Sequence, residues 1–554
     1  MPLPALRRCL LMAAISLVCF TTGALASDRA AIPVGVAKID ITPEYAVRLS
    51  GFGGRRQESE GVTMKIWAKA LAFSDEDGPV ILITADNLCV PDEITSDIAR
   101  RLHDKIGLKR ERLTITATHT HTAPMLKDVC PTLFGVPIPA DHEANIDRYT
   151  AEFTDKLEEV ALAAHRNIRP AHLSWGNGLV TFAANRRTQG GPVDHDFPVL
   201  AVHDLDGKLR AAYFSYACHC VTLSDNKISG DWAGFAQHRI EELFPGAIAL
   251  ASVGCGADSN PTSGVTGANV EVCAKQGEEI AQEFKRLLAN GLKPINSKPE
   301  PRYTRVDIPF DTPRSRAEWE ERAKRQDAVG HHARVTLERL DRGEKLPEKM
   351  NYPIQTWVFG DELAIVFLPG ETVVDYSLRL KREYDRSRLW VNGYSNDGRC
   401  YIPSERILKE GGYEGGDAMI YYDFPQRFAP GLEQKIISAV AAELPPSFKA
   451  PPGTEGTRPL SATEALRHFR TKPGLKVELA ASEPLIQDPV AIDWGADGKL
   501  WVCEMHDYPS GLDSNWQPGG RVKFLTDTNG DGLYDSSTIF LEKLPFPTGI
   551  TAWG

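Results

Sequence analysis

The stretch Leu113-Thr114-Ile115-Thr116-Ala117-Thr118-His119-Thr120-His121-Thr122-Ala123-Pro124 joins a β-branched run to a pair of histidines. Residues 113–116 have the composition of a buried strand. The imidazoles of His119 and His121 follow at the carboxyl end of that strand or in the loop beyond it. Because imidazole nitrogen is a preferred zinc ligand, the pair is a candidate metal site, although an isolated pair of this kind also occurs in polar loops.

Two further segments place a side chain that can bind a metal just after a strand. His219 follows a strand-like run at 211–215, and Glu371 follows the apolar run 363–367 through a Pro-Gly turn. Each has a structural alternative when taken singly, a core histidine in the first case and a turn carboxylate in the second. Since α/β proteins gather their active sites at the carboxyl ends of strands, the three segments together predict one site.

Apolar runs and amphipathic stretches alternate from residue 32 to about residue 445, which predicts an α/β domain of mixed α+β sheets with flanking helices. The helix predicted at 316–341 is charged throughout and is expected on the surface. We predict strands at 80–84, 113–116, 247–250 and 363–367, and the other helices at 93–106, 147–165, 232–243 and 271–290.

The N-terminal residues have the pattern of a cleaved signal peptide over 1–26. Arg7 and Arg8 precede an apolar run at 9–20, and Ala24-Leu25-Ala26 suits a signal peptidase. The sequence therefore predicts a secreted or periplasmic protein. No later run of about 18 apolar residues occurs, so we expect no transmembrane segment.

The net charge limits which partners are expected, and the cysteine content bears on disulfide bonds. The net charge of -11 provides no basic face for phosphates, so nucleic acid is not expected as a partner. Eight cysteines follow residue 26 without a CxxC motif. Export would permit disulfides, but no pairing is assigned, and Cys218, Cys220 and Cys255 are interpreted as small buried apolar residues.

The end of the chain differs in kind from the rest. A proline-rich segment at 446–460 is interpreted as a linker. Beyond it, short strand-like runs at 498–502 and 520–525, separated by turns, predict an all-β unit over 461–554.

Several motifs occur together in an order that resembles the catalytic domain of the neutral/alkaline ceramidase family, over about residues 32–445. The motifs are Thr118-His119-Thr120-His121-Thr122, Asn185-Arg186-Arg187, the His219 strand, the loop 254–261, Leu368-Pro369-Gly370-Glu371, and the tyrosine pair Tyr401 and Tyr413. The resemblance implies hydrolysis of the amide bond of an N-acylated, ceramide-like lipid, with peripheral membrane contact as an option.

The same resemblance implies a role for each site residue. Zinc would be held by His119, His219, Glu371 and Tyr401. Tyr413 would polarise the substrate carbonyl and stabilise the oxyanion, while a zinc-bound water with its pKa lowered toward about 7 attacks. His121 would lie behind the ligands or contact the reacting group, and Arg186 would line the carbonyl region.

The loop before Pro261 departs from the family pattern. The family has a catalytic serine directly before this proline, where this chain has Asn260, and Ser259 stands one place earlier. An asparagine could position water or donate to an oxyanion, but it could not be a nucleophile. Ser259 would replace the missing hydroxyl only if the loop shifted by one residue.

The segment from Asp488 to Val522 resembles the opening blade of sorbosone dehydrogenase-like β-propellers, which predicts a partial propeller at 461–554. Asp527, Asn529, Asp531 and Asp535 have the spacing of a calcium loop, with Thr538 at the twelfth position instead of glutamate. A solvated hairpin turn is an equal alternative. Two other functions stay open, a propeller-type dehydrogenase with an accessory N-terminal domain and an inactive zinc-bearing binding domain.

Overall fold

The computed structural model describes residues 29–450 and 462–553, except 467–468, 470, 473, 509–510 and 513–515. The predicted signal peptide and residues 451–460 of the predicted linker lie outside the described residues. The chain divides into two compact units, residues 1–450 and 451–554.

The larger unit is built on a nine-stranded sheet in the order β4-β3-β2-β1-β5-β7-β8-β9, with β11 beside β5. Its central pairs are antiparallel, whereas the outer pairs β3–β4 and β8–β9 are parallel. The strands are β1 (Ile32–Asp40), β2 (Trp67–Asp75), β3 (Gly78–Ala85), β4 (Leu113–Ala117), β5 (Arg169–Leu179), β7 (Asp196–His203), β8 (Leu209–Tyr216), β9 (Ile248–Val253) and β11 (Lys293–Ile295).

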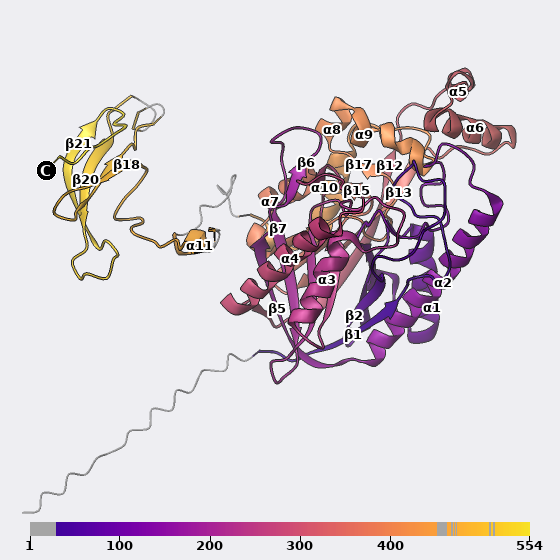
Figure 1. The fold of residues 1–554 in the computed structure, drawn as a ribbon, viewed down its shortest axis with the longest axis horizontal. Helices are drawn as coiled ribbons and strands as arrows, with labels where there is room; N and C mark the ends of the chain where they lie inside the picture. The colour runs from indigo at the N-terminus through magenta and orange to yellow at the C-terminus, as the bar shows by residue number, and fades with distance from the viewer. Residues whose placement is uncertain are drawn as a thin grey trace, which may run out of the picture. The chain divides into compact units, whose positions relative to one another are not determined.

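Helices cover one face of this sheet, and a second sheet covers the other. Alternate residues of β2 show the arrangement, because Ala70 packs among the helices while Phe73 packs among residues of the second sheet. The Phe73 ring lies 5.9 Å from that of Trp357 in the second sheet. The covering helices are α1 (Asp92–Ile106), α2 (Ala140–Arg166), α3 (Asp231–Leu243) and α4 (Val270–Asn290) (Figure 1).

The second sheet has the order β12-β13-β14-β16, and helices pack on its outer face. The large unit therefore has four layers, in the order helices, sheet, sheet, helices. The elements are β12 (Pro299–Pro309), β13 (Lys349–Phe359), β14 (Leu363–Phe367), β16 (Leu389–Asn392), α7 (Val374–Glu383) and α10 (Leu432–Glu443).

Several short elements outside these two sheets carry much of the site described below. Two pairs of short strands occur, β6 with β10 and β15 with β17. These elements are β6 (Ala183–Asn185), β10 (Ser259–Pro261), β15 (Glu371–Thr372), β17 (Tyr401–Ile402), α8 (Glu405–Glu410) and α9 (Gly412–Gly415).

The predicted α/β class is confirmed, and each predicted strand and the first four predicted helices coincide with an observed element. The prediction of one helix at 316–341 is wrong. The segment forms α5 (Arg316–Ala323) and α6 (Ala328–Asp341), because Asp327 caps a new helix by accepting from the Gly330 amide at 3.1 Å. The surface prediction is also wrong in part, since Trp319 and His332 are buried and their rings lie 5.5 Å apart.

The smaller unit is one antiparallel sheet, β18-β19-β20-β21. Its buried apolar cluster consists of Leu500, Val502 and Leu525. The all-β prediction is confirmed, while the propeller stays a prediction. The strands are β18 (Pro489–Trp494), β19 (Leu500–Glu504), β20 (Gly520–Thr526) and β21 (Ser536–Leu544), and a short helix, α11 (Ala462–Leu466), precedes them.

Two expectations from composition can be compared with the described residues. Within this part of the chain no helix combines the length and apolarity that a membrane span needs. The cysteines at 218, 220 and 255 are completely buried and unpaired, which agrees with their interpretation as small core residues.

Candidate metal centre and active site

The three strand-end segments predicted from the sequence meet at one edge of the two sheets. His119 follows β4, His219 follows β8, and Glu371 begins β15 after β14. Backbone bridges from Thr116 to Ser395 and from Gly254 to Asn392 join the ends of β4 and β9 to the end of β16 and the chain just after it. These bridges bring side chains from both sheets together.

The side chains at this edge converge to hydrogen-bond distances. Glu371 Oε2 lies 3.2 Å from His119 Nε2 and 3.1 Å from His219 Nε2. Tyr401 Oη lies 3.4 Å from His219 Nε2, and the parallel pairing of β15 with β17 sets Tyr401 directly beside Glu371. All four residues that the family resemblance implied as zinc ligands therefore lie together.

His121 also belongs to this group. Its Nε2 lies 3.2 Å from His119 Nε2, and the candidate ligand atoms of the three histidines lie within 4.8 Å of one another. His121 Nδ1 is buried and has no hydrogen-bond partner among the described residues. The structure thus places His121 in contact with the proposed zinc ligand His119, and its role behind the ligands or at the reacting group stays a prediction.

Backbone carbonyls orient two of the imidazoles. His119 Nδ1 lies 2.8 Å from the Leu88 carbonyl oxygen, and His219 Nδ1 lies 2.9 Å from that of Gly256. Because a carbonyl only accepts, each Nδ1 carries the proton and each Nε2 presents its lone pair to the centre. Two buried lone pairs that face a carboxylate are unfavourable unless a proton or cation lies between them, so the donor set fits a bound metal ion.

The electrostatics of the site favour neutral side chains at His121 and His219 and an ionised carboxylate at Glu371. Burial, helped by Arg186, lowers the pKa of His219 to about 4. Burial and the neighbouring histidines hold the pKa of His121 well below its ordinary value. Burial would raise the pKa of Glu371, but His119 and His219 outweigh it and keep that pKa low. These are the protonation states in which such side chains bind metals.

Arg186 lies beside the candidate metal ligands and connects them to the loop at 254–261. Its Nη2 donates to Tyr401 Oη at 3.1 Å, and its Nη1 lies 3.4 Å from Asn260 Oδ1 and 3.5 Å from His219 Nε2. The pairing of β10 with β6 aligns Asn260 with Ala184.

Ser259 takes a different place from Asn260. Its side chain is completely buried, and its hydroxyl has no hydrogen-bond partner among the described residues. Its backbone carbonyl accepts from the His219 amide at 2.9 Å. The residue of this loop whose side chain contacts the site is therefore Asn260.

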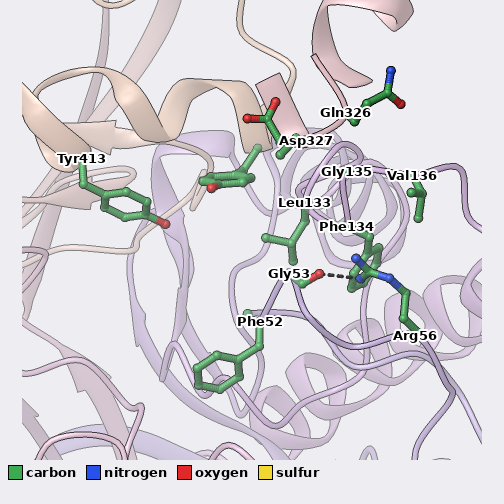
Figure 2. Close-up of a pocket in the computed structure, with 13 residues that line it drawn as sticks. Phe52, Gly53, Arg56, Leu133, Phe134, Gly135, Val136, Gln326, Asp327 and Tyr413 are labelled. Carbon is green, nitrogen blue, oxygen red and sulfur yellow. Dashed lines mark hydrogen bonds between the residues drawn. The ribbon is translucent and has the colours of Figure 1, made fainter. Parts of the chain in front are cut away.

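Tyr413 lies between the candidate metal ligands and a pocket. Its ring lies 5.2 Å from that of Tyr401, and 44% of its surface is exposed. The pocket has a volume of about 420 Å³, and Figure 2 shows the Tyr413 hydroxyl directed into it. The pocket adjoins the histidines, because the Phe52 ring lies 5.2 Å from that of His121. Its other side chains include Leu133, Phe134, Val136 and Tyr421, with Arg56, Gln326 and Asp327 as the polar ones.

Sequence reasoning missed two tyrosines of the site. The Tyr422 hydroxyl donates to Glu371 Oε1, and the buried Tyr394 ring lies 4.4 Å from the His119 ring. Neither residue stands in a motif with the spacing of a known site. The one available signal was that both lie in the tyrosine-rich segment around Tyr401 and Tyr413.

The predicted calcium loop has its oxygen atoms engaged within the turn itself. The Asp527 carboxylate accepts from the amides of Gly530 and Gly532, and that of Asp535 accepts from Thr528. Among the described residues, the side chains that lie close enough together to hold a metal are His119, His121 and His219. The contacts of the loop are those of a hairpin turn, and calcium stays a prediction.

Comparison with known proteins identifies similar chains for each part. Residues 33–286 match the family model described as neutral/alkaline non-lysosomal ceramidase, N-terminal, and residues 461–554 match one described as a domain of unknown function (DUF7133). Neutral ceramidase of Mycobacterium tuberculosis is 23% identical over 480 residues, which are 70% of this chain and 74% of the relative. Neutral ceramidase A of Dictyostelium discoideum is 22% identical over 249 residues, 41% of this chain and 34% of that relative.

Solved structures show the same relationship at the level of fold. The crystal structure of neutral ceramidase from Pseudomonas aeruginosa has a TM-score of 0.59 and 17% identity, with 93% of this chain and 90% of that chain covered. A structure described as ceramidase complexed with C2 has the same TM-score at 16% identity. The matched segment spans about a third of the Dictyostelium relatives, 34% and 33% of their lengths. This chain therefore has a ceramidase-like fold, and its residues 33–286 have the sequence pattern of a neutral/alkaline ceramidase N-terminal domain.

Proposed function

We propose that the large unit is a zinc-dependent hydrolase of the amide bond in an N-acylated, ceramide-like lipid. The observation that carries the proposal is the convergence of His119, His219 and Glu371, with Tyr401 beside them, where each Nδ1 is anchored so that each Nε2 faces the centre. Nitrogen and oxygen ligands of this kind are typical of hydrolytic zinc sites. The ceramidase-like fold and sequence pattern support the reaction class.

Each residue of the site has a task in this reaction. His119, His219, Glu371 and Tyr401 would hold the zinc, and His121 would complete the group from the side of the pocket. Bound zinc would polarise the substrate carbonyl and lower the pKa of water at the site. Arg186 binds and orients the amide, and the Tyr413 hydroxyl donates a hydrogen bond to the carbonyl oxygen as negative charge develops on it.

Asn260 favours direct attack by water over a covalent route, because an amide is not a nucleophile. Its Oδ1 faces Arg186 Nη1, which leaves its Nδ2 group as a donor toward the reacting atoms. Hydrolysis then proceeds by addition of water to the carbonyl carbon and collapse with cleavage of the C–N bond, in which a proton from the attacking water passes to the departing amine and the fatty acid is released without an acyl-enzyme.

The pocket supports an amphiphilic substrate. Its wall of Phe52, Leu133, Phe134 and Val136 suits a hydrocarbon segment, and Arg56 and Asp327 suit a polar head. A lipid substrate, peripheral contact with a membrane and a secreted or periplasmic location belong to the same proposal, the last on the signal-peptide pattern at 1–26.

The test is metal analysis of the purified protein together with an assay on a panel of N-acyl substrates that includes ceramide. We expect one zinc per chain and release of fatty acid that stops on chelation and returns with zinc. A protein without metal would overturn the zinc mechanism. A zinc-bearing protein that binds but never hydrolyses these lipids would favour the binding-domain alternative.

Replacing Tyr413 with phenylalanine is expected to lower kcat by about 10²-fold, because it removes one donor to the developing oxyanion. KM should change little, since that interaction strengthens in the transition state. Tyr421→Phe is the matched control, because Tyr421 lines the same pocket and its ring lies 6.1 Å from that of Tyr413. Equal kcat for Tyr413→Phe and Tyr421→Phe in steady-state assays would contradict the role of Tyr413.

A further inference from the structure

Glu414 is a buried carboxylate that binds two arginines at once. Its side chain is 4% exposed. Oε1 accepts from Arg186 Nε at 2.8 Å, and Oε2 accepts from Arg187 Nη1 at 2.6 Å. Glu414 directly follows Tyr413 on α9, so the pair of bonds ties the segment that carries Tyr413 to the end of β6.

The bond from Glu414 fixes the direction of the other N–H groups of Arg186. A guanidinium is planar and rigid, so holding Nε sets where Nη1 and Nη2 point. In the observed orientation Nη2 reaches Tyr401, and Nη1 faces Asn260 and His219. A rotated guanidinium would lose these contacts together.

Glu414 also balances the positive charge of Arg186. Arg186 places a cation 3.5 Å from His219 Nε2, an atom that faces the proposed metal. Within the described part of the chain, Glu414 is the carboxylate that forms an ion pair with Arg186, whereas Arg187 pairs with Glu410 as well. A buried cation that loses its partner keeps its desolvation cost, so it tends to move toward water.

We infer that Glu414 is a positioning residue, which holds the Arg186 guanidinium in the one orientation that contacts Tyr401, Asn260 and His219. The expected effect of Glu414 on kcat rests on the proposed function. The expected effect on zinc affinity concerns the metal site alone. Residues that orient metal ligands from behind are worth about 10–100-fold in metal affinity or activity in known sites.

The experiment compares the full-length wild type with Glu414→Gln, Arg186→Gln, the double variant and the control Glu410→Gln. Glu410 binds Arg187 and Arg406 but makes no bond to Arg186. Each protein is checked for folding by circular dichroism, for zinc affinity by competition with a chelator, and for kcat and KM on the N-acyl substrate that the wild type hydrolyses best.

For Glu414→Gln we expect about tenfold weaker zinc binding and a kcat reduced by about 10²-fold, with KM little changed. The double variant should resemble Arg186→Gln, because a residue that acts through Arg186 adds nothing once Arg186 is gone. Glu410→Gln should retain the zinc affinity and the kcat of the wild type.

Wild-type zinc affinity and kcat in Glu414→Gln would overturn the inference, and so would effects of Glu414→Gln and Arg186→Gln that multiply in the double variant. If Glu414→Gln does not fold, Glu414→Asp replaces it, because it keeps the charge but cannot reach both arginines, and wild-type behaviour of that variant overturns the inference equally. If the wild type binds zinc but hydrolyses nothing, the proposed function fails while the zinc affinities still decide the role of Glu414. A wild type without zinc overturns both.

Discussion

Replacing His219 with alanine is expected to remove the bound metal and to lower amide hydrolysis by at least about 10³-fold. His219 is completely buried, its Nε2 lies 3.1 Å from Glu371 Oε2, and its Nδ1 is held by the Gly256 carbonyl. Alanine leaves the Glu371 carboxylate with one imidazole fewer and opens a gap in the ligand set. Metal ions contribute several kcal/mol to such transition states, and each 1.36 kcal/mol is tenfold in rate, which gives this magnitude.

The measurement is the zinc content of the purified variant beside its rate on the same N-acyl substrate. His238→Ala is the matched control, because His238 lies on α3, is 62% exposed and pairs with Glu242. It should keep full zinc content and activity. A His219→Ala protein that retains one zinc per chain would show that His219 is not a ligand, whatever its activity.

Replacing Trp232 with alanine is expected to lower the free energy of unfolding of the large unit by about 3–5 kcal/mol. The side chain is completely buried at the start of α3, with the rings of Phe182 and Tyr216 at 5.6 and 5.9 Å. Its Nε1 donates to the His219 carbonyl at 2.9 Å. Alanine would therefore leave a cavity and remove the N–H donor from a carbonyl directly behind a proposed metal ligand, which would keep only the weak contact with the Cys218 thiol at 3.6 Å.

Trp232→Phe separates these two contributions, because it keeps most of the ring volume but removes the N–H group. It should cost about 1 kcal/mol, the usual net contribution of one hydrogen bond, because the carbonyl keeps its weak donor, the Cys218 thiol. Denaturant unfolding of the zinc-loaded proteins measures both variants, and chelator-treated samples separate metal loss from packing loss. Equal stability of Trp232→Ala and wild type would contradict the packing argument.

Local patterns predicted the elements that hold the site. The runs at 113–116 and 363–367 are short and β-branched, and both form fully buried strands, β4 at the end of the large sheet and β14 inside the second sheet. The helix at 316–341 could not be predicted correctly from its charges. The Asp327 side chain accepts a hydrogen bond from the Gly330 amide and so starts a second helix. The burial of Trp319 depends on its contact with His332, which the periodicity of the segment does not reveal.

The candidate site was predictable where a residue type and its position after a strand were enough, as for His119, His219 and Glu371. Tyr422 and Glu414 were not, because each acts through contacts with residues far away along the chain. The choice between Asn260 and Ser259 depended on the pairing of β10 with β6, since moving by one residue along a strand reverses the direction of the side chain.

The amino-acid sequence by itself determined the types of the main secondary-structure elements and the potential metal ligands at their ends. It also determined that the C-terminal segment is a separate all-β unit. These properties follow from periodicity and residue chemistry over a few neighbouring positions. Only the tertiary structure decided that His121 lies against His119, that Asn260 faces Arg186, and that Glu414 binds Arg186 and Arg187. These relations arise where strands distant in the sequence meet, and their geometry is set by long-range pairing that no local pattern encodes.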